Sequence, residues 1–290
     1  ELITAVNYLG VPHPPGYPTY IILLKIFTSI TPFGNLALKS NLFSVLTSIA
    51  AISIIFLFTF KLSEKIFPEF PRFIKLIVCS IGGFIISASP LFWSQSIVTE
   101  VYSLNALFVS IILLISYKII DNPGSESYKI KCLVWGLAVG LSLGNHLTIL
   151  AVIAPLFCII LTELKLNFKK YIYIVTGLII GLTTYIYIPI SAAHNPPINW
   201  GGADTFGGFI WLITAEPYRE YVLGINQSLL FSRLIEYMQI LFLQFNPLGI
   251  FLCIIGGLAI FRKMPKLFYP LTASTIILSL YSLSYNSVDF

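Results

Sequence analysis

The residues that could transfer a proton or hold an anion are few in this chain, and they lie in short, unusual segments. The 290 residues include three histidines. His13 lies among prolines in GVPHPPGYPTY, His146 ends the sequence GNH, and His194 begins HNPPINWGG. Imidazole titrates near physiological pH, so these side chains are candidates for proton transfer or for binding a phosphate.

One carboxylate and two arginines extend this set. Glu100, in FWSQSIVTEVYSLNALF, lies near the end of an apolar run, where an isolated carboxylate costs free energy unless it is paired or hydrated. It is therefore a candidate functional residue, and an ion pair with Arg219 is the structural alternative. Guanidinium groups bind phosphate in a bidentate way, which makes Arg219 the first candidate for an anion site. Arg233 is the second, with an i,i+3 ion pair to Glu236 as its alternative.

Several classes of site are excluded by their patterns. GGADTFGG (201–208) does not follow a predicted strand, so it does not indicate a dinucleotide-binding or phosphate-binding loop. No HExxH, GxSxG or metal-ligand spacing is present. The four cysteines lie in or beside apolar runs without a CxxC pair, which predicts buried, inert thiols. We expect no metal and no cofactor.

The composition defines the elements that must position these residues. Hydrophobic residues make up 57% of the chain and charged residues 10%, whereas soluble domains carry about 25% charged residues. Apolar runs recur, and lipid offers no hydrogen-bond partner to an open backbone, so these runs must be helices. We predict an all-α polytopic transmembrane helical bundle, with residues 1–290 as a single domain. The net charge of +5 does not indicate nucleic-acid binding, because basic residues in such proteins set orientation.

The basic residues predict a topology. Most of the 17 lysines and arginines fall in four segments, 61–75, 118–131, 165–170 and 262–266. We predict that the chain crosses the membrane over residues 36–60, 74–92, 98–119, 132–146, 148–164, 171–192, 246–261 and 267–285. With these spans, all four basic segments lie on the same side of the membrane. The positive-inside rule makes that side cytoplasmic. The histidines then gather on the outer side with Glu1, Glu100 and Arg219, which predicts an outward-facing site. Trp200 is a candidate sugar-binding aromatic residue there, with an interfacial anchor as the alternative.

Two further apolar segments are predicted to lie along the outer membrane surface. Residues 18–31 are short for a crossing and carry Lys25, and residues 228–245 place polar side chains at helical spacing. Ahead of the first segment, the prolines around His13 fix the backbone and bias the residue before each proline towards an extended conformation. We expect this stiffness to aim His13 into the site.

Four motifs that span most of the chain in order resemble a known family. ELITAVNYLGVPHPPGYPTY, FWSQSIVTEVYSLNALF, GLSLGNHLT and YIPISAAHNPPINWG are similar to the protein O-mannosyltransferase-like family of membrane glycosyltransferases, in the C-type glycosyltransferase superfamily. The resemblance implies a first span, a large outer loop with interfacial helices, and further spans, so this chain would be a fragment without the first span and the C-terminal region. The substrate-binding candidates in and around these motifs are His13, Pro14, Tyr17, Tyr102, Asn145, His146, His194, Trp200 and Arg219.

The resemblance also implies a mechanism. An acidic residue of the first outer loop acts as general base on an acceptor hydroxyl, which attacks the anomeric carbon with inversion while the lipid phosphate leaves. The family pattern Asp-x-Gly-Glu is represented here by Glu1 alone, so the expected aspartate lies outside the chain and Glu1 is its neighbour. The catalytic candidates are Glu1, Glu100 and His13.

These observations predict an integral-membrane enzyme that moves a sugar, with mannose preferred, from a polyprenyl-phosphate donor to a hydroxyl on the extracytoplasmic face. Its partners would be the lipid-linked donor, a protein Ser/Thr or glycan acceptor, and membrane lipid, with no nucleic acid. A transporter or lipid flippase is the alternative, and it predicts mid-membrane charges and repeated halves with broken helices. A non-catalytic membrane scaffold would leave the outer polar set unexplained. The Ile- and Lys-rich composition favours a bacterial inner membrane over the endoplasmic reticulum.

Overall fold

The computed structural model describes residues 1–164 and 168–286, so Lys165 of the third predicted basic segment lies outside the described residues. Within this part of the chain the only β-structure is one bridge between Val11 and Asn199, which confirms the predicted all-α fold. The longer helices in chain order are α1 (Leu2–Tyr8), α2 (Pro18–Ile30), α3 (Leu36–Ile66), α4 (Arg72–Ser87), α5 (Pro90–Ser96), α6 (Tyr102–Asp121), α7 (Tyr128–Leu143), α8 (Leu150–Glu163), α9 (Phe168–Leu182), α10 (Tyr187–Ala193), α11 (Phe206–Ile213), α12 (Leu230–Lys263) and α13 (Pro265–Ser284). Four short 3-10 helices join them: η1 (Leu147–Ile149), η2 (Thr183–Ile186), η3 (Glu216–Tyr221) and η4 (Gln227–Leu229).

Among the described residues, five helical segments are long and apolar enough to cross a membrane, which makes the chain an integral membrane protein. They are Leu36–Ile66, Tyr102–Asp121, Lys170–Ala193, Gln227–Lys263 and Pro265–Ser284, and each contains most of a predicted span. Helices α7 and α8 form at two further predicted positions and break at the expected corner around Gly144. With 16 and 14 residues they are shorter than the roughly 20 residues of a full crossing.

The predicted span over 74–92 is wrong as a continuous helix. Helix α4 ends at Ser87, α5 begins at Pro90, and the two axes differ by 71°. Ser89 has an extended backbone (φ −64°, ψ 137°) because the ring of Pro90 disfavours the helical conformation in the residue before it. The pair therefore forms either a broken span or a re-entrant segment.

One predicted boundary also needs correction. Helix α6 begins at Tyr102 rather than at 98, so Glu100 lies just ahead of the helix and not within it. The predicted boundary between residues 228–245 and 246–261 coincides with a sharp kink at Asn246 (φ 49°, ψ 171°), which divides α12 into two helical parts. Pro247 follows the kink and cannot donate a helical hydrogen bond, which explains why the helix bends there.

Glycines bring α7 and α9 into backbone contact. Gly136 and Gly140 on α7 face Gly177 and Gly181 on α9. A Cβ atom at Gly140 would lie 2.4 Å from the carbonyl oxygen of Leu178, and one at Gly177 would lie 2.1 Å from that of Leu133. Each helix thus carries a Gly-x-x-x-Gly pair, the pattern that lets membrane helices approach closely. This contact holds α9 against α7, and α9 continues through η2 into α10.

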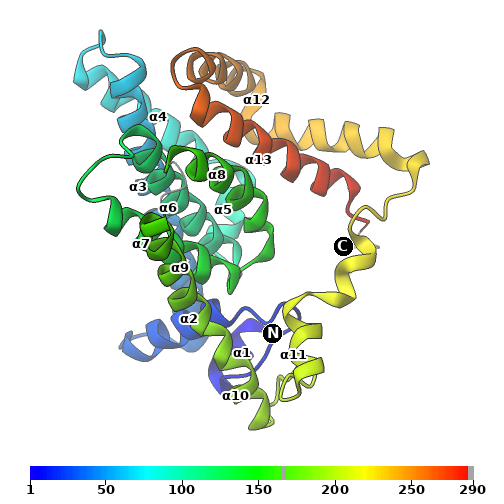
Figure 1. Cartoon of the computed structure of the whole chain (residues 1–290). Coiled ribbons are helices and arrows are strands. Elements are labelled where there is room, and N and C mark those ends of the chain that lie inside the picture. Colours follow the sequence, from blue (N-terminus) through cyan, green and yellow to red (C-terminus); the bar gives the residue numbers. More distant parts are fainter. Residues whose placement is uncertain (165–167, 287–290) are drawn as a thin grey trace.

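The outer segments fold against one another at one end of the bundle, where α1, α2, α10 and α11 lie in Figure 1. Val11 donates to the carbonyl oxygen of Ile198 at 2.8 Å and accepts from the N–H of Trp200 at 3.0 Å. The Tyr187 hydroxyl adds a bond to the carbonyl oxygen of Gly10 at 2.7 Å. The turns between α3 and α4 and between α12 and α13 lie at the opposite end, in agreement with the separation of basic and polar segments.

The prediction of four buried thiols is right for Cys132 alone. Cys79 is half-buried, and Cys158 and Cys253 are exposed. Cys158 lies on α8 and Cys253 on α12. Both side chains are exposed because they lie on apolar helix faces that no other described helix covers. The sequence alone does not distinguish an apolar face that is covered from one that is not.

Candidate active site

One outer cavity of about 880 Å³ collects most of the predicted polar residues. It lies between the proline-rich segment before α2, the corner between α7 and α8, the η3 segment, and the outer ends of α12 and α13. The predicted residues that line it are His13, Pro14, Tyr17, Tyr102, His146, Arg219 and Arg233. Sequence positions more than 200 residues apart therefore meet in one site.

Glu1 and His13 form a bidentate contact at the edge of this cavity, called here the Glu1–His13 pair. The backbone N–H of His13 donates to Oε1 of Glu1 at 2.8 Å, and Nδ1 lies 2.6 Å from Oε2. Burial acts to raise the pKa of the Glu1 carboxyl, but the hydrogen bonds from His13 outweigh it, so that the pKa is lowered. The carboxylate is therefore ionised and oriented at both of its oxygens.

The other nitrogen of His13 faces Tyr17. Nδ1 contacts the Glu1 carboxylate, and Nε2 lies 3.0 Å from the Tyr17 hydroxyl, which also donates to the carbonyl oxygen of Pro14 at 3.5 Å. Burial raises the pKa of the Tyr17 phenol well above its usual range, so Tyr17 keeps its proton. A carboxylate, an imidazole and a phenol thus form one hydrogen-bonded chain.

A tight turn places Tyr17 in this chain. Gly16, with φ of 84°, donates to the carbonyl oxygen of His13 at 2.9 Å, and Tyr17 follows as the N-cap of α2. A Cβ atom at Gly16 would lie 2.9 Å from a methyl group of Leu212, so both the backbone conformation and the packing require glycine. Pro18 then starts α2, where a missing N–H costs nothing.

His146 contributes a neutral imidazole that can donate a hydrogen bond. Its Nδ1 accepts the backbone N–H of Thr148 at 3.3 Å and lies 2.7 Å from the Thr148 hydroxyl. Because a backbone N–H can only donate, the ring proton must be on Nε2. Burial, followed by the charge of His13, lowers the pKa of His146 to about 4, so the ring is neutral at physiological pH. His146 therefore brings a neutral N–H donor, with its ring centroid 6.3 Å from that of Tyr17 and 5.5 Å from that of Tyr102.

Two guanidinium groups line the same cavity. Arg219 pairs with Glu216 at 3.8 Å and Arg233 with Glu236 at 4.0 Å, each one helical turn away. The i,i+3 alternative for Arg233 is therefore present, whereas the predicted ion pair of Arg219 with Glu100 is not formed. Both carboxylate contacts are long and their residues are partly exposed, so each guanidinium keeps donors that can reach a ligand.

Apolar helix faces form the remaining wall of the cavity. Leu150 and Ala151 come from α8, and Ile277 and Leu278 come from α13. A ligand in this cavity would meet charged and hydrogen-bonding groups on one side and membrane-helix side chains on the other.

Five predicted site residues do not line the cavity: Glu1, which contacts it through His13, and Glu100, Asn145, His194 and Trp200. Asn145 is fully buried and donates to the carbonyl oxygen of Val101 at 3.2 Å, which ties the corner that carries His146 to the start of α6. His194 instead contacts the carbonyl oxygen of Ile190 at the end of α10, and the indole of Trp200 is 45% exposed. Asn145 therefore supports the site, while Glu100, His194 and Trp200 are not among the residues that line the cavity.

Sequence reasoning predicted Tyr17 and Tyr102 but missed three other tyrosines of the cavity. Tyr218 comes from η3, and Tyr281 and Tyr285 come from the end of α13. Tyr281 and Tyr285 are four residues apart and their ring centroids are 5.3 Å apart. The spacing in YSLSY could have indicated one aromatic face, but only the fold shows that this face meets the proline-rich segment. Among the described residues no group of three His, Cys, Asp or Glu side chains could hold a metal.

These features define a polytopic helical membrane protein with a cavity, at the end of the bundle opposite the basic turns, in which acidic, imidazole and guanidinium groups meet apolar helix faces. A family model described as "Protein O-mannosyl-transferase TMEM260 N-terminal domain" matches residues 1–170, more than half of the chain, and the chain belongs to this family. The family expected from the four motifs is thereby confirmed.

Two curated relatives agree with this assignment. Protein O-mannosyl-transferase TMEM260 of Mus musculus is 30% identical over 236 residues, which cover 78% of this chain and 32% of the relative. Protein O-mannosyl-transferase tmem260 of Dictyostelium discoideum is 28% identical over 277 residues, which cover 88% of this chain and 32% of the relative. The chain thus spans about a third of the length of these relatives. No solved structure matches it. Both relatives are eukaryotic, so they lend no support to a bacterial inner membrane.

Proposed function

We propose that the chain is the membrane-embedded catalytic part of a protein O-mannosyltransferase, which moves mannose from a polyprenyl-phosphate donor to a hydroxyl of a protein on the extracytoplasmic face. The observation that carries this proposal is the composition of the outer cavity. It joins the imidazole of the Glu1–His13 pair, two guanidinium groups and the apolar faces of α8 and α13. The names of the family and of the relatives support mannose as the sugar and protein as the acceptor.

The two walls of the cavity suit the two parts of a lipid-linked sugar. The polyprenyl chain would lie against α8 and α13, since both are apolar and the cavity reaches their side chains. The phosphate would lie by Arg219 and Arg233, where guanidinium groups form charge-assisted hydrogen bonds to anionic oxygens. The neutral N–H of His146 adds a donor that requires no counter-ion.

The reaction would proceed by direct displacement. The acceptor hydroxyl gives its proton to a carboxylate of the first outer loop, and its oxygen attacks the anomeric carbon from the face opposite the phosphate. The bond between the anomeric carbon and the phosphate oxygen breaks, and its electron pair leaves with the lipid phosphate, so the configuration inverts. Preorganised cations and N–H donors stabilise that developing charge without rearrangement.

Within this scheme the Glu1–His13 pair belongs to the wall beside the base. The resemblance implies that the base is an aspartate ahead of Glu1, and the bidentate contact with His13 would hold this stretch of the loop in place. The pair also keeps the Glu1 carboxylate ionised. His13 is therefore assigned a positioning role, with its Nε2 directed to Tyr17.

The test is a transfer assay on the full-length protein in detergent. Polyprenyl-phosphate mannose is offered in parallel with a nucleotide-activated mannose, together with a Ser/Thr-rich acceptor protein. Transfer from the lipid donor alone, reduced in Arg219→Ala and retained in His194→Ala, is the expected result. Transfer from the nucleotide donor alone would overturn the donor proposal, and full activity of Arg219→Ala would overturn the assignment of the phosphate site. Glu100→Gln is expected to keep its activity, since Glu100 lies outside the cavity.

The transporter alternative has two structural features in its favour, the 71° break between α4 and α5 and the kink at Asn246 in α12. Its other expectation was charged residues at mid-membrane. The charged residues of the cavity, Arg219 and Arg233, instead come from the outer segment between α11 and α12 and from the start of α12. The family membership also favours transfer over transport.

A further inference from the structure

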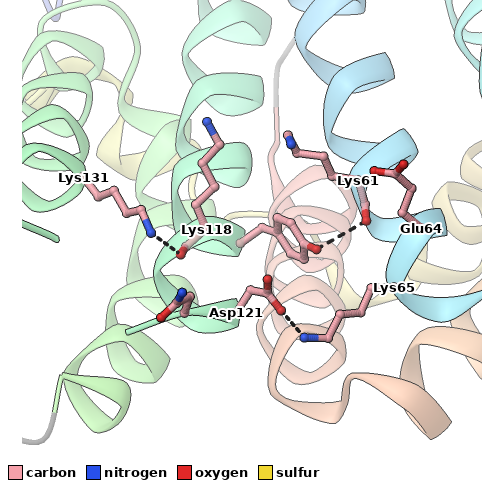
Figure 2. A pocket seen from close by; sticks show the side chains of 8 residues that line it. Lys61, Glu64, Lys65, Lys118, Asp121 and Lys131 are labelled. Carbon is pink, nitrogen blue, oxygen red and sulfur yellow. Dashed lines mark hydrogen bonds and ion pairs between the residues drawn. The ribbon is translucent and has the colours of Figure 1, made fainter. Parts of the chain in front are cut away.

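A second cavity, of about 530 Å³, lies at the opposite, basic end of the bundle. It is formed by the last turns of α3 and α6 and the first turn of α7. Four lysines and two carboxylates line it, together with Tyr117 and Asn122: Lys61, Lys65, Lys118, Lys131, Glu64 and Asp121. Figure 2 shows the four lysines and the two carboxylates of this cavity.

The two carboxylates of this cavity are already engaged. Asp121 forms an ion pair with Lys65, and Glu64 lies 3.6 Å from Nε of Arg72. Neither carboxylate is therefore a free partner for the remaining lysines.

Lys61, Lys118 and Lys131 form no ion pair with a carboxylate among the described residues. Lys131 donates only to neutral oxygens, the carbonyl of Lys118 at 3.1 Å and the hydroxyl of Ser125 at 2.7 Å. Lys61 and Lys118 are half-buried, and their ammonium groups contact no described acceptor. In Figure 2 the ammonium ends of Lys61 and Lys118 extend away from the Lys65–Asp121 pair. The cavity thus carries an excess of positive charge that its own residues do not neutralise.

We propose that this cavity binds a phosphate anion, supplied by the headgroup of an anionic phospholipid of the cytoplasmic leaflet. Three observations support the lipid as the source. The cavity opens between membrane helices, it lies on the face that the positive-inside rule makes cytoplasmic, and basic pockets at that level attract anionic headgroups. Lys61 and Lys118 would contact the phosphate oxygens, while the Lys65–Asp121 pair closes the far side.

The site is separate from the transfer reaction. None of its residues lines the outer cavity, and the basic segments that form it lie at the other end of the molecule. Binding of a headgroup here would join α3, α6 and α7 at their cytoplasmic ends, and a ligand that binds only the folded protein raises its stability.

Lipid binding can be measured on the purified full-length protein in a neutral detergent, from the midpoint of thermal unfolding. Dioctanoyl phosphatidic acid, dioctanoyl phosphatidylcholine and inorganic phosphate are titrated separately. Phosphatidic acid is expected to raise the midpoint and to saturate, and phosphatidylcholine is expected to leave it unchanged. An equal response to inorganic phosphate, at the same concentrations, would overturn the lipid as the source.

The variant Lys61→Gln/Lys118→Gln tests the residues. It is expected to raise the half-saturating concentration of phosphatidic acid roughly tenfold or more, because two charged hydrogen-bond donors are removed. Arg262→Gln/Lys263→Gln removes the same charge from the same face outside the cavity and is the matched control. Equal half-saturation in the two double variants would overturn the proposal.

Further variants keep the test valid if the double variant does not fold. Lys61→Arg/Lys118→Arg keeps both charges and is expected to retain saturable binding, and each single glutamine variant is expected to weaken it several-fold. Unchanged binding in both single variants would count against the site. A loss of thermal stability without a loss of lipid response would mean that the lysines act only on the helix ends, which would also overturn it.

Discussion

His13 holds both oxygens of Glu1, with its backbone N–H 2.8 Å from Oε1 and its Nδ1 2.6 Å from Oε2. The two residues are twelve positions apart in the sequence, and the segment between them contains α1 and the start of the proline-rich turn. A carboxylate bound through both oxygens has one orientation. The contact therefore fixes the orientation of Glu1 relative to the proline-rich segment at the edge of the cavity.

Replacement of His13 by alanine should separate activity from folding. The Glu1 carboxylate then loses the imidazole contact and Tyr17 loses its imidazole partner, so we expect mannose transfer to fall roughly 10²-fold through misplacement of the loop. The thermal midpoint of the full-length protein should change little, because both side chains are partly exposed. His194→Ala is the matched control. A parallel loss of activity and stability in His13→Ala would reduce the segment to a structural turn.

Arg219→Ala and Arg233→Ala should weaken use of the lipid donor. Each removes a guanidinium from the cavity, so we expect the donor KM to rise roughly tenfold, in line with the loss of a charged hydrogen bond. Steady-state kinetics at varied donor concentration measure this. Arg72→Ala, on the opposite face, should leave the KM unchanged. If all three variants behave alike, the phosphate does not lie where we place it.

His146 should make the protein sensitive to acid. Its pKa is about 4 in the folded protein, below the value of about 6.5 of an unfolded histidine. The unfolded state therefore binds the proton more readily, and the free energy of unfolding should decrease as the pH falls from about 6.5 towards 4. In His146→Gln the thermal midpoint should decrease less over this range. Identical pH profiles for the two proteins would contradict the neutral imidazole.

The contact between α7 and α9 should not tolerate a methyl group. Gly140→Ala places a Cβ atom 2.4 Å from the carbonyl oxygen of Leu178, and we expect a loss of about 1–3 kcal/mol in the free energy of unfolding. Gly82→Ala in α4 meets no atom within 4 Å and should be neutral or stabilising. Denaturant unfolding in detergent compares the two. A stable Gly140→Ala protein would show that the helices are not held by this approach.

The placement of His13, His146 and Arg219 at one end of the molecule was predictable. The basic segments assign alternate loops to one side of the membrane, so the loops that carry these three residues fall on the other side. Glu100 stays a prediction: it does not line the cavity, but its charge acts on Tyr17 and Tyr102, which do. Its place in the segment just ahead of α6 was not predictable, because propensity does not locate a helix start exactly. The Gly-x-x-x-Gly pairs of α7 and α9 were visible in the sequence, but the motif alone does not name its partner helix.

By itself the sequence determined that the chain is helical and membrane-embedded, since apolar runs of this length have no other stable form in lipid. It also determined which end is basic and which family motifs the chain carries. Only the tertiary structure decided that Tyr17, His146, Arg219 and Tyr281 share one cavity, and that Lys61 and Lys118 share another. Contacts between residues this distant in the sequence depend on how whole helices pack. The type and spacing of a residue carry no information about a partner two hundred positions away.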